Sequence, residues 1–131
     1  MNATLQLDFD QADLHVHLDA LDEAELDALG FGVIGIDAAG VVNRYNTYES
    51  NFAGLGKPRV LGHPLFTAVA PCMNNFMVAQ RFADAADATT PLDATIDYVL
   101  TLRMRPVKVK LRLLAAPGLA GRYVQIGRAH V

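Results

Sequence analysis

The spacing of apolar and polar positions divides the chain into a helical N-terminal segment and a part richer in strands. In residues 10–29, leucines recur at near-helical spacing with acidic residues between them, and Gly30 follows the last leucine. This pattern predicts one or two short helices that end at the glycine. Residues 31–37 and 41–46 are rich in β-favouring side chains and flank Ala38-Ala39-Gly40, so they predict a hairpin.

The middle of the chain predicts short helical turns followed by one longer helix. Glycine and proline occur six times in residues 47–71, a density of helix breakers that argues against one long element. Residues 75–88 return to helical spacing, and Thr89-Thr90-Pro91 ends them. The side chains expected on one apolar face of this helix are Phe76, Ala79, Phe82, Ala83 and Ala86.

Three further strands are expected in residues 94–104, 106–115 and 122–125. The order is then two strands, short helices, one longer helix and three strands. It predicts an α+β fold in which helices lie against one face of an antiparallel sheet. Five strands in this order match the PAS fold, with residues 1–29 as an N-terminal helical cap and residues 30–125 as the PAS domain.

Composition narrows the class of protein. The 131 residues are 52% hydrophobic and 19% charged, which is typical of one globular domain. The net charge is −3, and the basic residues of 103–112 alternate with apolar ones, which predicts a solvent-exposed strand face and no nucleic-acid partner. No run of 18 apolar residues is present and the N-terminus lacks a secretion signal, so we expect a cytoplasmic protein without a membrane partner. We expect a monomer or a weak homodimer.

The last six residues form a separate segment in this interpretation. Residues 126–131, Ile-Gly-Arg-Ala-His-Val, resemble the translated read-through of a common sequencing adapter. We therefore expect a non-native tail from about Ile126 onward and assign His130 no function. Sequencing the source gene through its stop codon tests this expectation, and a native stop directly after Val131 would refute it.

The candidate chemistry lies in one thiol, one phenol and one carboxyl group. Cys72, the only cysteine, ends the sequence Val69-Ala70-Pro71-Cys72, downstream of Tyr45 and Glu49. A thiol can attach a small acidic ligand, and backbone N–H groups of the helix expected to follow Cys72 can stabilise the reactive thiolate. The phenol and the carboxyl group can hold the far end of the ligand. Taken singly, each also fits an ordinary role: a buried small hydrophobe, a strand tyrosine and a solvated loop acid.

Four segments carry a resemblance to a known family: residues 29–37, Tyr45-Asn46 with Glu49, residues 60–72, and residues 98–110. The similarity extends over nearly all of residues 15–125. On these segments the chain resembles the photoactive yellow protein (xanthopsin) family, PAS proteins that sense blue light through a cysteine-linked 4-hydroxycinnamoyl (p-coumaroyl) chromophore. The spacing of the tyrosine, the glutamate and the Ala-Pro-Cys sequence is the most specific part.

The resemblance implies a role for each matching residue. Cys72 would carry p-coumaric acid as a thioester, Tyr45 and Glu49 would hydrogen-bond its phenolate oxygen, and Met104 would line the pocket and aid thermal recovery. Tyr98 is either a ligand contact or an aromatic residue of the central sheet.

The sequence departs from the family at two positions. Ala53 stands where the family has a threonine that supports the tyrosine, and Leu55 stands where an arginine gates the chromophore. The phenolate pocket is therefore expected to have one fewer supporting hydrogen bond and one fewer nearby cation.

The mechanism that the resemblance implies is a light-driven proton transfer. Glu49 can donate to a buried phenolate only if it is protonated at neutral pH, which desolvation and a neighbouring anion favour. Light would isomerise the bound group, and Glu49 would then give its proton to the phenolate. The buried carboxylate left behind costs several kcal/mol, and partial unfolding of the cap is the expected relief. An unknown downstream signalling protein would read this change.

Two other functions stay open from the sequence. The chain is alternatively a PAS module that senses another small ligand or binds a protein partner without photochemistry. An enzyme that uses Cys72 as its nucleophile is disfavoured because no motif places a histidine as the base. His15 and His17 are two residues apart, which on a helix points them in different directions, so we expect no metal site there.

Overall fold

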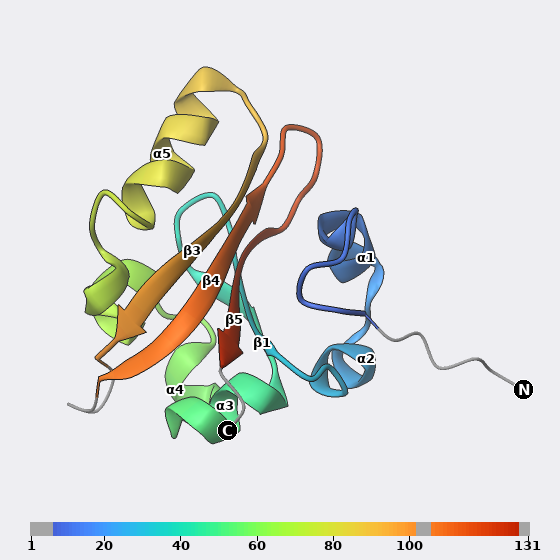
Figure 1. The fold of residues 1–131 in the computed structure, drawn as a ribbon, viewed down its shortest axis with the longest axis vertical. Helices are drawn as coiled ribbons and strands as arrows, with labels where there is room; N and C mark the ends of the chain where they lie inside the picture. The colour runs from blue at the N-terminus through green and yellow to red at the C-terminus, as the bar shows by residue number, and fades with distance from the viewer. Residues whose placement is uncertain (1–6, 102–105, 129–131) are drawn as a thin grey trace, which may run out of the picture.

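The computed structural model describes residues 7–101 and 106–128, and its elements follow the predicted order. The hairpin consists of β1 (Gly32–Ile36) and β2 (Val42–Tyr45). The later strands are β3 (Leu92–Leu100), β4 (Val107–Ala115) and β5 (Arg122–Arg128). Together they form a five-stranded antiparallel sheet in the order β2-β1-β5-β4-β3 (Figure 1), which confirms the predicted fold class.

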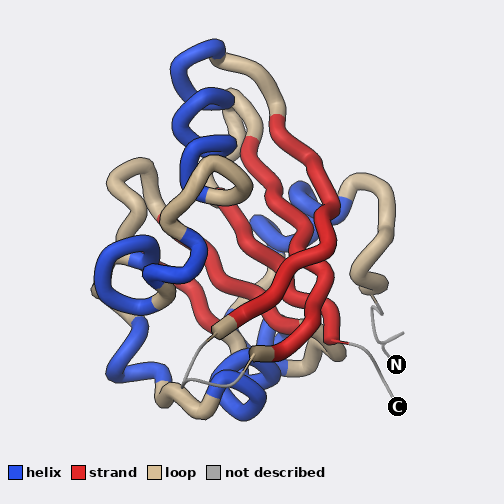
Figure 2. The backbone as a smooth tube through the Cα atoms, turned by 60° about the vertical axis from the view of Figure 1, so that its left-hand side comes forward, coloured by secondary structure: helices blue, strands red, loops and turns tan. Residues whose placement is uncertain are grey.

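Helices cover both faces of this sheet, whereas the pattern predicted one covered face. The inner face carries α3 (Thr47–Ala53), α4 (Lys57–Val60) and α5 (Ala79–Ala88), with a π turn and a 3-10 turn between α4 and α5 (Figure 2). The outer face carries the cap helices α1 (Leu14–Ala20) and α2 (Glu23–Asp27). The cap leucines that predicted these helices are the side chains that bury the outer face.

The sheet therefore separates two hydrophobic cores. Ile34 and Ile36 of β1 belong to the inner core with Phe82 of α5, while Val33 belongs to the outer core with the cap leucines. Successive side chains of a strand point to opposite faces, so β1 supplies both cores. All five of its residues are buried for that reason.

A buried arginine, Arg112 of β4, holds the N-terminal segment on the sheet. Its guanidinium pairs with Asp93 and donates to the carbonyl oxygens of Phe9 and Gln11, both at 2.8 Å. The sequence pattern predicted that Arg112 lies on a solvent-exposed strand face. This prediction was wrong, since the residue is 6% exposed. Arg112 does lie on the outer face of β4, as the alternation of basic and apolar residues indicates. That end of the outer face is covered by the N-terminal cap and not by solvent.

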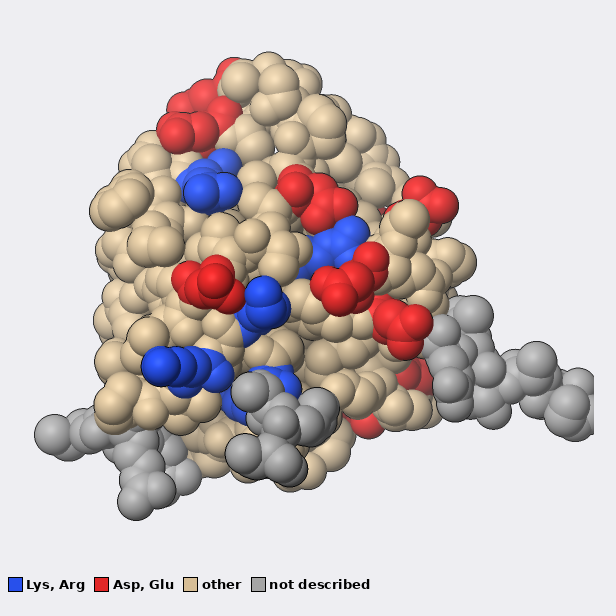
Figure 3. Space-filling view, viewed as in Figure 1, with Lys and Arg blue, Asp and Glu red and all other residues tan. Residues whose placement is uncertain are grey.

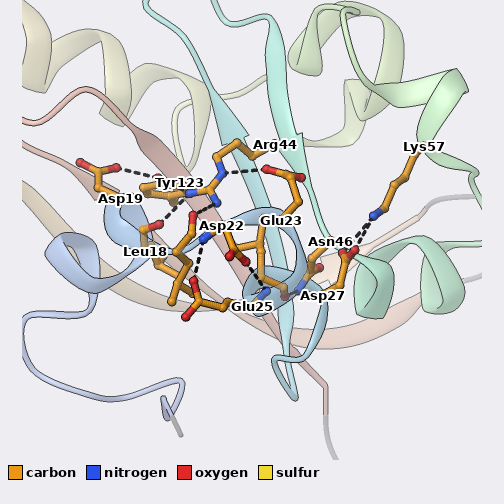
Figure 4. A network of polar contacts seen from close by, with 12 residues as sticks. Leu18, Asp19, Asp22, Glu23, Glu25, Asp27, Arg44, Asn46, Lys57 and Tyr123 are labelled. Carbon is orange, nitrogen blue, oxygen red and sulfur yellow. Dashed lines mark hydrogen bonds and ion pairs between the residues drawn. The ribbon is translucent and has the colours of Figure 1, made fainter. Parts of the chain in front are cut away.

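A second arginine, Arg44 of β2, binds the cap helices from the side (Figure 4). It donates to the carbonyl oxygens of Leu18 and Leu21, both at 2.6 Å, and to the Tyr123 hydroxyl. The Tyr123 hydroxyl in turn donates to Asp19. Burial and the hydrogen bond to Asp19 raise the pKa of Tyr123 to about 12, so the phenol stays a donor at neutral pH.

Helix α5 is shorter than predicted and buries a different face. It begins at Ala79, and its buried side chains are Phe82 and Ala85, next to the buried Val78. The face predicted from Phe76 was wrong, because Phe76 precedes the helix and is 79% exposed. The Asn75 side chain accepts from the Met77 and Val78 N–H groups, and this turn delays the helix start.

Strand β5 runs beyond its predicted end at residue 125. Ile126 is fully buried and pairs with Gly32 of β1 and Leu111 of β4. Residues 129–131 lie outside the described part of the chain. The expectation that residues 126–131 are non-native, like the domain limits, stays a prediction.

Candidate functional site

Tyr45 and Glu49 come together because a strand turns directly into a helix between them. Tyr45 ends β2, and Glu49 lies in the first turn of α3. Asn46 caps the helix: its Oδ1 accepts from the N–H groups of Glu49 and Val33, and its amide donates to the carbonyls of Leu26 and Phe31. This fully buried amide fixes the Glu49 backbone relative to both β1 and the cap.

The Glu49 carboxylate forms a buried ion pair with Arg128 at the end of β5. The two guanidinium nitrogens donate to its two oxygens at 2.5 and 2.9 Å. The side chains are 1% and 10% exposed, respectively, and the guanidinium also lies 5.3 Å from the centre of the Phe52 ring. Burial raises the pKa of Glu49, and the hydrogen bonds and charge of Arg128 oppose that rise. Glu49 thus has a charged partner that the sequence interpretation did not include.

The backbone of Gly32 makes room for this carboxylate. A Cβ at position 32 would lie 2.1 Å from Glu49 Oε1, far inside contact distance. Glycine is therefore required at this point of β1, because the carboxylate packs directly against the strand.

Tyr45 is a buried phenol whose hydroxyl donates to the Leu55 carbonyl at 3.1 Å. The Ser50 hydroxyl donates to the same carbonyl at 2.9 Å. Burial raises the pKa of Tyr45, the Glu49 charge raises it further, and the Arg128 charge opposes the rise. The phenol is therefore held as a neutral donor close to the Glu49–Arg128 pair.

Cys72 lies in the 3-10 turn Pro71–Met73, half-buried and packed against the inner core that contains Tyr45. Its backbone carbonyl accepts two hydrogen bonds, from the Tyr98 hydroxyl at 2.5 Å and from the Asn75 amide at 3.2 Å. Tyr98, which the sequence left open, therefore contacts the Cys72 backbone.

Of the remaining predicted site residues, Ala53 and Leu55 lie within the described part of the chain, and Met104 does not. Ala53 is buried in the last turn of α3, and Leu55 follows the left-handed Gly54 and packs against the inner core. Leu55 is next to Tyr45, since the Leu55 carbonyl accepts a hydrogen bond from the Tyr45 hydroxyl. Met104 lies outside the described residues.

Two surface grooves adjoin these residues. One, of about 690 Å³, is lined by Asn75, Met77, Tyr98 and residues of β3 and β4. The other, of about 600 Å³, lies between the N-terminal segment and the ends of β4 and β5 and is lined in part by Phe9 and Arg128. Acidic and basic side chains are interspersed on the face shown in Figure 3.

Across residues 7–101 and 106–128, no three His, Cys, Asp or Glu side chains are grouped so that they could hold a metal ion. Within the same residues, no helix has both the length and the apolar character needed to cross a membrane.

Sequence reasoning missed Arg128, although a signal for it was present. Val124 and Ile126 of β5 point into the inner core, so period-2 alternation puts residue 128 on the same face. The expectation of a non-native tail removed this residue from consideration. Asn75 carried no signal, because its role depends on where β3 lies.

Comparison with known proteins gives the following similarities. A curated protein named Photoactive yellow protein from Rhodothalassium salexigens is 32% identical over 108 residues, which cover 82% of this chain and 86% of that protein. One of the same name from Halochromatium salexigens has the same identity and coverage. The solved photoactive yellow protein domain of the sensor histidine kinase Ppr from Rhodospirillum centenum has a TM-score of 0.79 at 36% identity, covering 87% of this chain and 99% of that domain. A PAS domain from Colwellia psychrerythraea, with a TM-score of 0.62 and 11% identity, shares the fold. No protein-family model matches the chain.

Proposed function

We propose that this chain, which belongs to the photoactive yellow protein family, is a blue-light photoreceptor that carries a 4-hydroxycinnamoyl group as a thioester on Cys72. The observation that carries the proposal is the make-up of the inner core. Tyr45 lies in it, Cys72 packs against it, and Glu49 follows Tyr45 across the turn from β2 into the first turn of α3. A thiol, a phenol and a carboxyl group form the donor set that a thioester-linked phenolic acid requires.

The three side chains fit this group in their chemistry. When bound, the chromophore would supply a double bond that isomerises in light and a phenol that ionises. Cys72 would provide the covalent attachment. The Tyr45 hydroxyl, kept protonated by burial, would donate to the phenolate oxygen in place of the Leu55 carbonyl.

Glu49 would hold the proton that moves in the light reaction. Its carboxyl group favours the neutral form because it is buried, and it has Arg128 as a partner when it is charged. The ion pair with Arg128 stabilises the charged form. A carboxylate formed after proton transfer would cost less here than an unpaired buried charge.

The cap is the element that we expect to respond. Asn46 bonds the Glu49 N–H on one side and the Leu26 carbonyl of α2 on the other. A shift in the first turn of α3 would therefore act on the cap directly. We propose a sensory role rather than an enzymatic one, with a protein that binds the altered cap as the downstream partner.

The test is to load the purified chain with p-coumaric anhydride and to record its visible spectrum and intact mass. We expect a yellow adduct of one p-coumaroyl group, which blue light bleaches and which recovers in the dark. Failure to acylate would favour a PAS module for another ligand or a protein partner. Acylation followed by steady release of p-coumaric acid would favour an enzyme.

Restoring the two family residues, Ala53→Thr with Leu55→Arg, is expected to change the absorption maximum and the recovery rate of the adduct. Threonine adds a hydrogen-bonding hydroxyl near Tyr45, and arginine adds a cation near the phenolate. Visible spectroscopy in the dark and after a blue flash measures both effects. An unchanged spectrum and an unchanged recovery rate would count against a role of these two positions in tuning the chromophore.

A further inference from the structure

The carbonyl oxygen of Cys72 is the meeting point of three segments. It accepts the Tyr98 hydroxyl of β3 at 2.5 Å and the Asn75 amide at 3.2 Å. The same Asn75 amide nitrogen donates to the Tyr98 hydroxyl oxygen at 2.7 Å. The three groups form a closed triangle, so each restrains the position of the other two.

Asn75 extends this triangle to the start of α5. Its Oδ1 accepts from the Met77 N–H at 3.0 Å and from the Val78 N–H at 3.2 Å. The amide group thus makes four hydrogen bonds, two as acceptor and two as donor, which is its full capacity. Because all four hydrogen bonds are made at once, the Asn75 side chain is held in one orientation.

This triangle compensates for a turn that is weak on its own. The 3-10 turn of Cys72 is three residues long, and its N-cap residue, Ala70, makes no side-chain hydrogen bond to it. Short 3-10 turns have poorer hydrogen-bond geometry than α-helices and deform more easily. Tyr98, in contrast, lies in the nine-residue strand β3, where its partner on β4 is Val109.

We propose that Asn75 and Tyr98 are positioning residues that tie the Cys72 turn to β3 and α5 and so keep the sulfur attachment point fixed during the light reaction. The proposal rests on the proposed function. If the attachment point is fixed, a change in shape of the bound group must be taken up at its other end, beside Tyr45 and Glu49. If the turn gave way, the change would be lost by rotation at Cys72.

The first test uses the chain without any chromophore and measures the rate at which iodoacetamide alkylates Cys72. Tyr98→Phe keeps the ring and removes the hydroxyl, and Asn75→Asp keeps the acceptor for Met77 and Val78 but removes the donor. Loss of one such hydrogen bond is expected to raise the alkylation rate roughly fivefold, because the turn opens more often. Tyr48→Phe, which removes a hydroxyl from α3, is the matched control and should leave the rate unchanged.

The second test measures dark recovery of the loaded protein after a blue flash. Tyr98→Phe and Asn75→Asp are expected to slow recovery roughly fivefold, because a freer turn relieves the strain that drives it. The dark absorption maximum should stay unchanged, since the phenolate contacts are intact. A structural role alone would lower the melting temperature and leave recovery unchanged.

The two tests separate this proposal from the proposed function. If the parent chain does not acylate but the variants alkylate faster, the photoreceptor assignment fails, and only the restraint of the Cys72 turn by Asn75 and Tyr98 is supported. Unchanged alkylation and recovery rates in both variants would overturn the positioning role, whatever the chromophore result.

Discussion

Replacing Cys72 with alanine is expected to abolish the yellow adduct completely. The chain has no other thiol, and a thioester requires one. Cys72 is half-buried at the edge of the inner core, so removing its sulfur should cost little stability and the variant should fold. Intact mass and visible absorbance after incubation with p-coumaric anhydride measure the loss.

Cys72→Ser is the matched control for this experiment. Serine keeps the size and polarity of the side chain, but its hydroxyl is a weak nucleophile at neutral pH without an activating base. We expect no adduct from it either, with a circular dichroism spectrum identical to that of the parent. A yellow adduct in Cys72→Ala would place the attachment on another residue and contradict the assignment.

Replacing Arg128 with leucine is expected to destabilise the protein by about 3–5 kcal/mol at neutral pH. The substitution leaves the Glu49 carboxylate buried without its partner, whose two hydrogen bonds are 2.5 and 2.9 Å long. Denaturant unfolding of the two chains at several pH values measures the difference in the free energy of unfolding.

The pH dependence has a definite sign. Burial raises the pKa of Glu49 above its usual range, so the unpaired group is neutral in the folded variant at low pH. Relative to the parent, the variant should therefore be most destabilised at neutral and higher pH. The deficit should shrink as the pH falls toward 4.5. A deficit that is constant from pH 4 to pH 8 would contradict a buried charged pair.

Two controls sharpen this result. Adding Glu49→Gln to Arg128→Leu removes the charge and should recover most of the lost stability. Lys57→Met breaks a pair with Asp27 whose side chains are about one-third exposed, and it should cost less than about 1 kcal/mol. An equal loss from both broken pairs would mean that the burial of Glu49 does not determine the cost.

The fold was largely predictable because its elements have strong local patterns. The cap leucines, the hairpin around Gly40 and the alternation in β3 and β4 each produce the expected element. Errors arose where tertiary contacts override the pattern. Arg112 has the local pattern of a surface residue, because nothing nearby in sequence shows that the cap lies over it. Phe76 lies outside the helix because the Asn75 side chain accepts from the Met77 and Val78 N–H groups, which follow it.

The candidate site was predictable in its residue types but not in its pairing. Tyr45 and Glu49 are four residues apart, so the strand-to-helix turn brings them together by itself. Arg128 is 79 positions from Glu49 in sequence, and only the β1–β5 pairing brings it near. Sequence patterns predict contacts between residues close together in the chain, such as Tyr45 and Glu49. They do not predict contacts between distant residues, such as Glu49 and Arg128.

The shared strand β1 has a consequence for communication across the molecule. Val33 and Ile34 are neighbours along the chain but face opposite sides of the sheet. A displacement on the sensing side therefore has one peptide unit to cross before it reaches the leucines beneath the N-terminal helices. In a domain of this design, the two hydrophobic cores lie on opposite faces of one strand, and no chain of intermediate residues is needed to connect them.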